Sequence, residues 1–190
     1  MINKKKYDIP IFENLLGNHN LENIAATFTV CRLLGLTSDQ VIQHLGSFKG
    51  LKYRMQYLGE KSNIKYYNDS KATNATSAAC SIKSLSNIYW LAGGIFKEET
   101  FAPLDDTIFN VKKAYLFGES KMLFAKYLNN KVKYEICENM QQAFIKARSD
   151  ALKNGVDAVI LLAPACSSYD QFKNFEDRGD QFIELYDNAE

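Results

Sequence analysis

Residues 87–94 read NIYWLAGG, an apolar run that stops at paired glycines. This pattern predicts a buried strand that ends in a turn. A second apolar run, residues 158–162 (AVILL), predicts another strand of the same kind. Continuously apolar strands separated by amphipathic helices are typical of a parallel sheet covered on both faces. From about residue 51 to the end, the sequence therefore predicts an α/β domain: a doubly wound, mostly parallel, Rossmann-like sheet with helices on both faces.

The remaining elements follow from the same periodicities. Strands are expected at residues 55–58, 64–67, 114–117 and 132–136, and helices at residues 75–85, 119–128, 140–152 and about 179–186. Before residue 51, two helices are expected, one from about residue 15 to Gly35 and one from Thr37 to Gly46. Two short helices bury little by themselves, so they look like the end of another domain. This places a domain boundary between residues 1–50 and 51–190.

The charge balance narrows the choice of partners. The chain has 190 residues with 23 Lys+Arg and 22 Asp+Glu, a formal net charge of +1. There is no electrostatic reason to propose nucleic acid or an anionic membrane. The longest apolar stretch, residues 158–166, contains Pro164 and is far shorter than the roughly 20 residues that span a bilayer. Without a secretory signal at the start, we expect a cytoplasmic protein.

The cysteines and histidines do not suggest a metal site. The four cysteines form no CxxC pair, and the only histidines are His19 and His44. A structural zinc site needs four clustered ligands, so we expect no metal-binding residues in this chain.

Three polar loops follow predicted strands: residues 68–74 (NDSKATN), 93–97 (GGIFK) and 163–170 (APACSSYD). Ligands of such sheets bind at the carboxyl ends of the strands. Lysines, hydroxyls and helix N-termini suit carboxylates or phosphates. For any one loop, a simple helix N-cap explains the polar residues about as well. Three such loops on one sheet edge favour a binding site.

Other chemistries lack their motifs. No GxxxxGK[ST] segment occurs, and GGIFK lacks the third glycine of a dinucleotide fingerprint. A serine nucleophile at Ser167 or Ser168 would need a histidine base, and the GxSxG turn is absent.

Five segments occur in one order: GNHNLEN (17–23), SFKGLKYRMQ (47–56), NDSKATN (68–74), LAGGIFK (91–97) and LLAPACSSYDQFKNFEDRGDQF (161–182). Together they resemble the C-terminal part of a Mur ligase, of the branch that adds D-glutamate. The resemblance implies that residues 1–50 end a central ATPase domain and that residues 51–190 form the C-terminal domain. It also implies a recombinant piece, a proteolytic fragment or a truncated gene product, inactive alone. The P-loop, the magnesium ligands and the UDP-binding domain would lie outside it.

The implied enzyme is a ligase that uses ATP and Mg²⁺ to add D-glutamate to UDP-N-acetylmuramoyl-L-alanine. It would serve peptidoglycan synthesis, and thereby cell-wall biogenesis, cell shape and division in the cell cycle. Two alternatives stay open. One is an inert fragment that binds nucleotide, glutamate or a partner, and the other is a related ligase such as a folylpolyglutamate synthetase.

The resemblance also implies roles for individual residues. Those expected at ATP are Asn23 at the adenine, Asp69 at the ribose and Arg54 at the phosphates. Those expected at the D-glutamate carboxylates are Lys71, Thr73, Lys97 and Ser168, with Tyr169 and Phe175 packed beside them; Lys71 and Lys97 are the catalytic candidates.

One position departs from the family pattern. Many members carry an acidic residue after the paired glycines, where this chain has Ile95. Glu98 or Glu99 is the expected substitute for orienting Lys97.

Overall fold

The structure, a computed structural model, describes residues 12, 15, 17–154 and 157–189. The chain divides into two compact units, Met1–Gly50 and Leu51–Glu190. In the described part of the chain, no helix is both long enough and apolar enough to cross a membrane.

The first unit contains the two predicted helices, α1 (Asn18–Leu33) and α2 (Ser38–Ser47). A capping box begins α2: the Thr37 hydroxyl accepts a hydrogen bond from the Gln40 amide (3.2 Å), and the Gln40 side chain accepts one from the Thr37 amide (2.8 Å). The assignment of this unit to a central ATPase domain stays a prediction.

The second unit contains a six-stranded sheet in the order β1-β2-β6-β3-β4-β5. Its strands are β1 (Gln56–Lys61), β2 (Ile64–Asn68), β3 (Ile88–Gly93), β4 (Val111–Phe117), β5 (Tyr134–Ile136) and β6 (Ala158–Leu162). Only the pairing of β1 with β2 is antiparallel; the pairings that join β2, β6, β3, β4 and β5 are parallel. The predicted mostly parallel sheet is confirmed.

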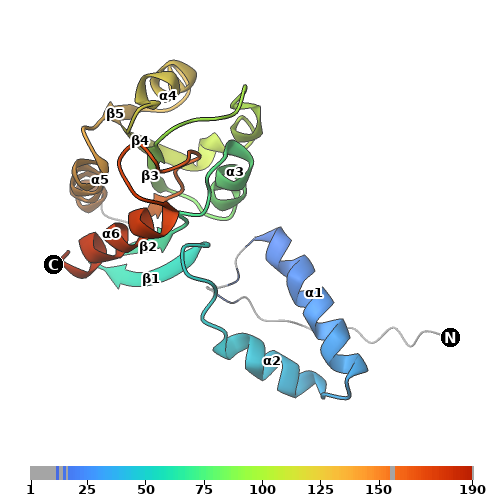
Figure 1. Cartoon of the computed structure of the whole chain (residues 1–190). Coiled ribbons are helices and arrows are strands. Elements are labelled where there is room, and N and C mark those ends of the chain that lie inside the picture. The colour runs from blue at the N-terminus through green and yellow to red at the C-terminus, as the bar shows by residue number, and fades with distance from the viewer. Residues whose placement is uncertain (1–11, 13–14, 16, 155–156, 190) are drawn as a thin grey trace. The chain divides into compact units, whose positions relative to one another are not determined.

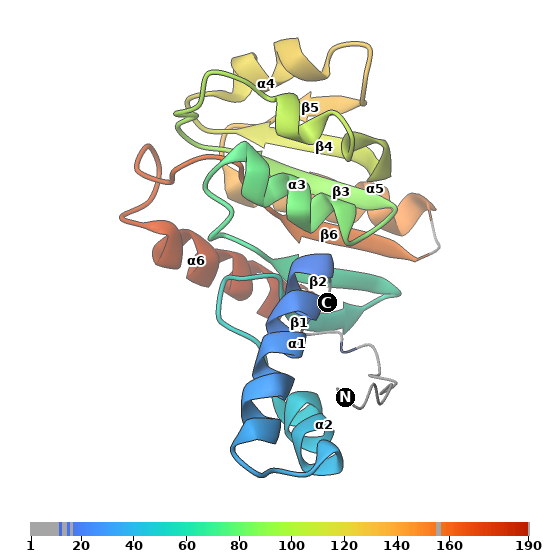
Figure 2. The same ribbon diagram turned by 90° about the vertical axis from the view of Figure 1, so that its right-hand side faces the viewer.

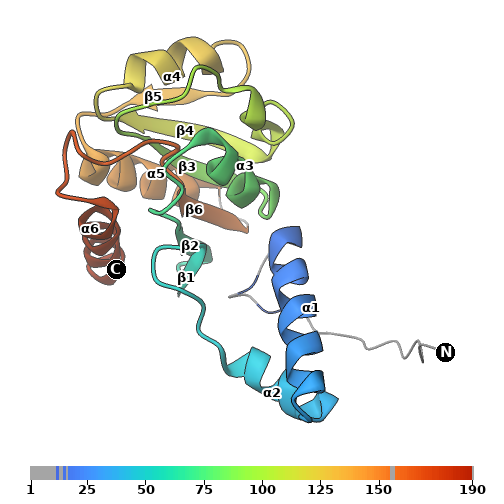
Figure 3. The same ribbon diagram turned by 45° about the vertical axis from the view of Figure 1, so that its right-hand side comes forward.

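Helices cover both faces of this sheet. They are α3 (Ala75–Lys83), α4 (Lys121–Leu128), α5 (Met140–Asn154) and α6 (Phe175–Asp187). Figures 1 and 3 show α5 and α6 on one side of the strands and α3 on the other. The connections through α3 and α4 run along the sheet in one direction, whereas α5 returns to β6 between β2 and β3. Because parallel crossovers are right-handed, this reversal puts α5 on the opposite face.

Each face has its own apolar core. Beneath α5 and α6, the ring of Phe144 packs against those of Tyr66 and Phe182 at centroid distances of 5.9 and 5.6 Å. On the other face, Trp90 of β3 packs against Phe124 of α4 at 5.9 Å. Strand residues buried on both sides explain the continuously apolar runs in the sequence.

Several elements differ from the prediction in their bounds; β4, for example, begins at Val111 rather than at residue 114. The connection from β3 to β4 contains 3₁₀ turns at Ala102–Leu104 and Ile108–Asn110, which the sequence pattern did not indicate. Helix α6 begins at Phe175 rather than near residue 179, because the Asn174 side chain accepts a hydrogen bond from the Asp177 amide (2.7 Å) and caps the helix.

An ionic network connects β4, β5 and α5, and it predicts a pH dependence of stability. Lys113 Nζ lies 2.7 Å from both Asp150 and Glu135, and the Tyr115 hydroxyl donates to Asp150 at 2.8 Å. Hydrogen bonds from Lys113 hold the pKa of Asp150 below its ordinary value. A group with a lowered folded-state pKa stabilises the fold above its unfolded pKa and loses that contribution as the pH falls.

We therefore expect Asp150→Asn to lower the free energy of unfolding by about 1 kcal/mol at pH 7, because the network is partly exposed. The difference from the unmodified chain should shrink as the pH falls below about 4. Urea unfolding at pH 7 and pH 3 measures both values, with the exposed Asp106→Asn as the matched control. A difference that is the same at both pH values would contradict this account.

Candidate functional site

The three predicted loops leave neighbouring strands at one edge of the sheet. They follow β2, β6 and β3, which are adjacent in that order. The Asp69 amide donates to Leu162 O at 2.7 Å, and the Gly93 amide donates to Pro164 O at 3.0 Å. Figure 2 shows the loops together at the carboxyl ends of the strands. We call residues 69–74, 94–99 and 163–174 the ligand loops.

Direct bonds join the loops beyond the strand ends. Ile95 and Ser167 form an antiparallel bridge, with N–H···O distances of 2.9 and 3.0 Å in the two directions. The Glu98 carboxylate accepts a hydrogen bond from the amide of Ala75 at the start of α3 (2.7 Å). The bridge holds the segment around Lys97 close to the segment around Ser168. The hydrogen bond of Glu98 holds the segment around Lys97 close to the segment around Thr73.

The two predicted lysines each lie beside an aromatic ring from the third loop or from α6. Lys71 Nζ lies 3.7 Å from the centre of the Phe175 ring. Lys97 Nζ lies 5.8 Å from the centre of the Tyr169 ring. Cation–π contacts at these distances orient an ammonium group while it keeps its charge. The arrangement offers two cations to an acidic ligand.

The other residues predicted at D-glutamate differ in access. Thr73 is half-buried and Ser168 is only 2% exposed, whereas Tyr169, predicted to pack beside the amino acid, is 66% exposed. The neighbouring Cys166 is fully enclosed, and burial raises the pKa of its thiol to about 12. A thiol of this kind stays protonated near neutral pH, so it is not a nucleophile.

Sequence reasoning missed Arg178, the buried residue that contacts all three loop regions. Its guanidinium donates to Ser70 Oγ (3.0 Å) and Ser70 O (2.8 Å) near the first loop. It also donates to Cys166 O (3.1 Å from each terminal nitrogen) and to Gly93 O (3.5 Å). An arginine in the first turns of an amphipathic helix is ordinarily exposed, so no local pattern predicts this burial.

The residues predicted at the nucleotide are placed differently. Asp69 is 7% exposed; one carboxylate oxygen accepts from the Met55 amide (3.2 Å) and the other from the Ser81 hydroxyl. Arg54 is exposed in the segment before β1, next to Met55. Asn23 lies on α1 in the first unit, where its side-chain amide donates to Asn20 (3.4 Å). Their contacts with ATP stay predictions.

The expected substitute for an acidic residue at position 95 has another partner. The Glu98 carboxylate binds the start of α3, as described above. Among the ion pairs of the described residues, none joins Lys97 to Glu98 or Glu99. Among the residues that the structure describes, the Tyr169 ring is therefore the only partner of the Lys97 ammonium.

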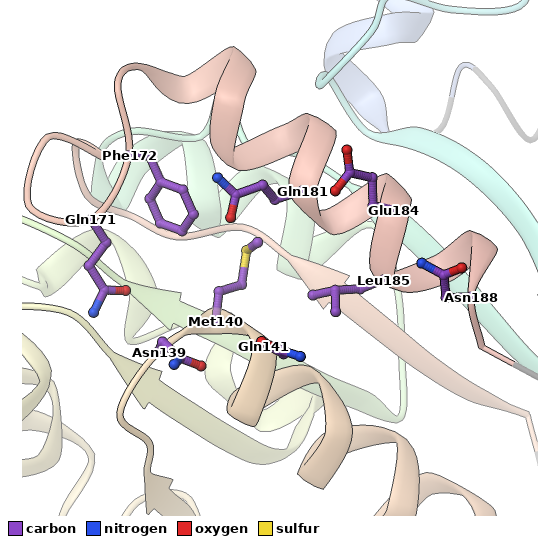
Figure 4. Close-up of a pocket in the computed structure, with 9 residues that line it drawn as sticks. All are labelled: Asn139, Met140, Gln141, Gln171, Phe172, Gln181, Glu184, Leu185 and Asn188. Carbon is purple, nitrogen blue, oxygen red and sulfur yellow. The ribbon is translucent and has the colours of Figure 1, made fainter.

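A pocket of about 440 Å³ lies between the start of α5, the end of the third ligand loop and α6 (Figure 4). Met140, Phe172 and Leu185 supply its apolar lining, and its other lining residues are amides and Glu184. None of the residues predicted at D-glutamate or ATP lines it. No group of three or more His, Cys, Asp or Glu that could hold a metal ion occurs in the described ranges.

A doubly wound sheet with lysines, hydroxyls and a helix N-terminus at its carboxyl edge is typical of α/β domains that bind anionic ligands. Within that class, the chain belongs to the Mur ligase family, because the family profile described as "Mur ligase, glutamate ligase domain" matches residues 53–166. The resemblance carried by the sequence motifs is thereby confirmed.

Two similar curated proteins carry the same enzyme name. The UDP-N-acetylmuramoylalanine–D-glutamate ligase of Rickettsia felis is 50% identical over 184 residues, covering 96% of this chain and 41% of that protein. The ligase of the same name from Agrobacterium fabrum is 42% identical over 177 residues, covering 93% of this chain and 38% of that protein. The chain thus spans about two fifths of the length of these relatives.

Solved structures agree with the fold. The UDP-N-acetylmuramate-alanine ligase of Thermotoga maritima has a TM-score of 0.66 at 15% identity, covering 99% of this chain and 42% of that chain. The folylpolyglutamate synthase of Mycobacterium tuberculosis has a TM-score of 0.59 at 15% identity, covering 93% and 41%. At this identity the likeness concerns the fold alone.

Proposed function

We propose that this chain is part of an ATP-dependent ligase that joins D-glutamate to UDP-N-acetylmuramoyl-L-alanine in peptidoglycan synthesis. The hydrogen-bonded junction of the ligand loops, which carries Lys71 and Lys97, is the observation that supports this most strongly. The names of relatives that are 42–50% identical support the same substrate. The enzyme would act in the cytoplasm and serve cell-wall biogenesis, cell shape and cell division.

In the proposed reaction, a carboxylate oxygen of UDP-N-acetylmuramoyl-L-alanine attacks the γ-phosphorus of ATP and releases ADP. The amine of D-glutamate then attacks the acyl carbon of the acyl phosphate. Inorganic phosphate leaves, the nitrogen loses a proton, and an amide bond is formed. Because two anionic substrates and a nucleotide must approach one another, fixed cations and hydrogen-bond donors are needed.

Within this chain, we assign Lys97, Thr73 and Ser168 to the carboxylates of D-glutamate. Holding both carboxylates leaves the amine as the free end of the amino acid and fixes its direction of attack. Lys71, held beside Phe175, adds a second cation to the same edge. Tyr169 would pack beside the bound amino acid.

We assign the nucleotide contacts to Asn23, Asp69 and Arg54. Any ribose hydroxyl would share the Asp69 carboxylate with Met55 and Ser81, since a carboxylate oxygen accepts more than one hydrogen bond. Mg²⁺ would neutralise charge on the nucleotide, but the described residues offer no acidic cluster that fits it. No step is assigned to Mg²⁺ in this chain.

The 190-residue chain alone should form no amide bond, because it contains no GxxxxGK[ST] segment to hold the nucleotide phosphates. A chimaera, in which this chain replaces the matching region of the Rickettsia felis ligase, should release ADP when D-glutamate is added. An ADP-release assay with UDP-N-acetylmuramoyl-L-alanine measures both.

Turnover by the chain alone would contradict the first expectation. A chimaera whose ADP release does not increase when D-glutamate is added would contradict the proposed substrate. Activity of the chimaera with L-glutamate and a folate acceptor in place of these substrates would favour the folylpolyglutamate alternative.

A further inference from the structure

Arg178 is a buried cation without a carboxylate partner in the described part of the chain. It is 0% exposed. A guanidinium has five N–H groups, and here all five point at carbonyl or hydroxyl oxygens: Ser70 Oγ, Ser70 O, Cys166 O twice and Gly93 O. Its hydrogen bonds are therefore satisfied without an ion pair, although the charge of Asp170 in the third ligand loop acts on it through space.

Burial lowers the pKa of Arg178 to about 10, so the side chain stays charged at neutral pH. A buried cation is costly unless something nearby benefits from its charge. The loops above Arg178 are those that carry the predicted ligands of an acidic amino acid. A bound carboxylate would add a second negative charge near this cation, beside that of Asp170 in the third ligand loop.

Ser70 connects Arg178 to the cation–π contact between Lys71 and Phe175. The Ser70 hydroxyl accepts from Arg178 Nε and donates to the carbonyl of Phe175 at 2.8 Å. Lys71 follows Ser70 directly, and its ammonium lies over the Phe175 ring. The position of Lys71 thus depends on the same hydrogen-bond chain.

We propose that Arg178 is a positioning residue that fixes the three ligand loops in the geometry that binds the acidic amino acid and places a positive charge beneath them. Lysine cannot replace arginine at this position, because the lysine ammonium has its three donors on one atom and cannot reach all these acceptors at once. The identity of the ligand, D-glutamate, rests on the proposed function. The role of Arg178 in joining the loops does not rest on the proposed function.

The first test uses the chimaera. Arg178→Lys, which keeps the charge, should raise the Michaelis constant for D-glutamate by about tenfold or more and change that for ATP by less than about twofold. Ser70→Ala should raise the constant for D-glutamate by a smaller factor. The double variant should be no worse than Arg178→Lys alone, because both changes break one hydrogen-bond chain.

Phe182→Leu is the matched control. Phe182 is also buried on α6, but its ring packs against Phe144 of α5, and a phenyl ring donates none of the hydrogen bonds that join the loops. It should weaken the fold and leave both Michaelis constants unchanged. If Phe182→Leu raises the constant for D-glutamate as much as Arg178→Lys does, general loss of stability explains the effect and the proposal is wrong.

The second test needs no activity. In the 190-residue chain, amide hydrogen exchange at Ile95 and Ser167 should be faster by about tenfold or more in Arg178→Lys, with little change in the middle of β4. If that variant does not fold, Ser70→Ala must show the same effect in weaker form. Unchanged exchange in a folded variant would overturn the proposal. A chimaera that never uses D-glutamate would instead refute the proposed function and leave the exchange result valid.

Discussion

Gly94→Ala should lower the free energy of unfolding of the second unit by about 3 kcal/mol or more. Gly94 has a φ of +128°, which side chains rarely adopt. An added Cβ would overlap the carbonyl oxygen of Ser167 and lie 2.9 Å from Cβ of Cys166. Both obstacles belong to the third ligand loop, so the loops would be forced apart.

Urea unfolding followed by the fluorescence of Trp90, the single tryptophan, measures this effect. Trp90 is a suitable reporter because its indole N–H donates to Ala163 O (2.7 Å) at the base of the third loop. Gly59→Ala is the control: its φ is +136°, and its Cβ would meet only the end of the Tyr186 side chain, which can turn away.

In the chimaera, Gly94→Ala should also raise the Michaelis constant for D-glutamate, whereas Gly59→Ala should cost stability and leave that constant unchanged. Stability of Gly94→Ala within about 0.5 kcal/mol of the unmodified chain would mean that the close contact of the second and third loops does not exist.

Lys97→Ala in the chimaera should raise the Michaelis constant for D-glutamate by about 10- to 150-fold, and Ser168→Ala should raise it in the same direction. The range corresponds to the loss of one charge-assisted hydrogen bond, about 1.5–3 kcal/mol. The constant for ATP should change much less, because neither side chain is assigned to the nucleotide. Steady-state kinetics with each substrate varied in turn separates the two constants.

The matched control is Lys112→Ala, which removes the same charge from an exposed position at the opposite, amino end of a sheet strand. It should leave both constants unchanged. An equal increase in the constants for D-glutamate and ATP in Lys97→Ala would show that the assignment of this loop to the amino acid is wrong.

The central strands of the sheet could be predicted from the sequence because they are buried on both faces. The run AVILL gave β6 with its observed bounds, Ala158–Leu162, since every one of these residues is buried. β1 begins at Gln56 and not at Met55, because Met55 has a φ of +41°, outside the strand region. The start of α6 at Phe175 could have been predicted from the sequence. Asn174, with Glu176 and Asp177 in the turn after it, is typical of a helix N-terminus.

The site could be predicted only in part. Polar loops after apolar strands indicated which segments meet, since parallel strands end at one edge. The bridge between Ile95 and Ser167 and the burial of Arg178 could not be predicted, because both depend on residues far apart in the sequence. The amide partner of Glu98 is non-local for the same reason.

A titration of the isotope-labelled 190-residue chain with D-glutamate, followed by amide NMR shifts, tests most directly whether the ligand loops form one site for an acidic amino acid. We expect saturable shifts of Thr73, Lys97 and Ser168 with a single shared dissociation constant, and weaker shifts in Lys97→Ala. The account is contradicted if no saturable shift occurs, or if the shifts gather at Met140 and Leu185 in the pocket of Figure 4.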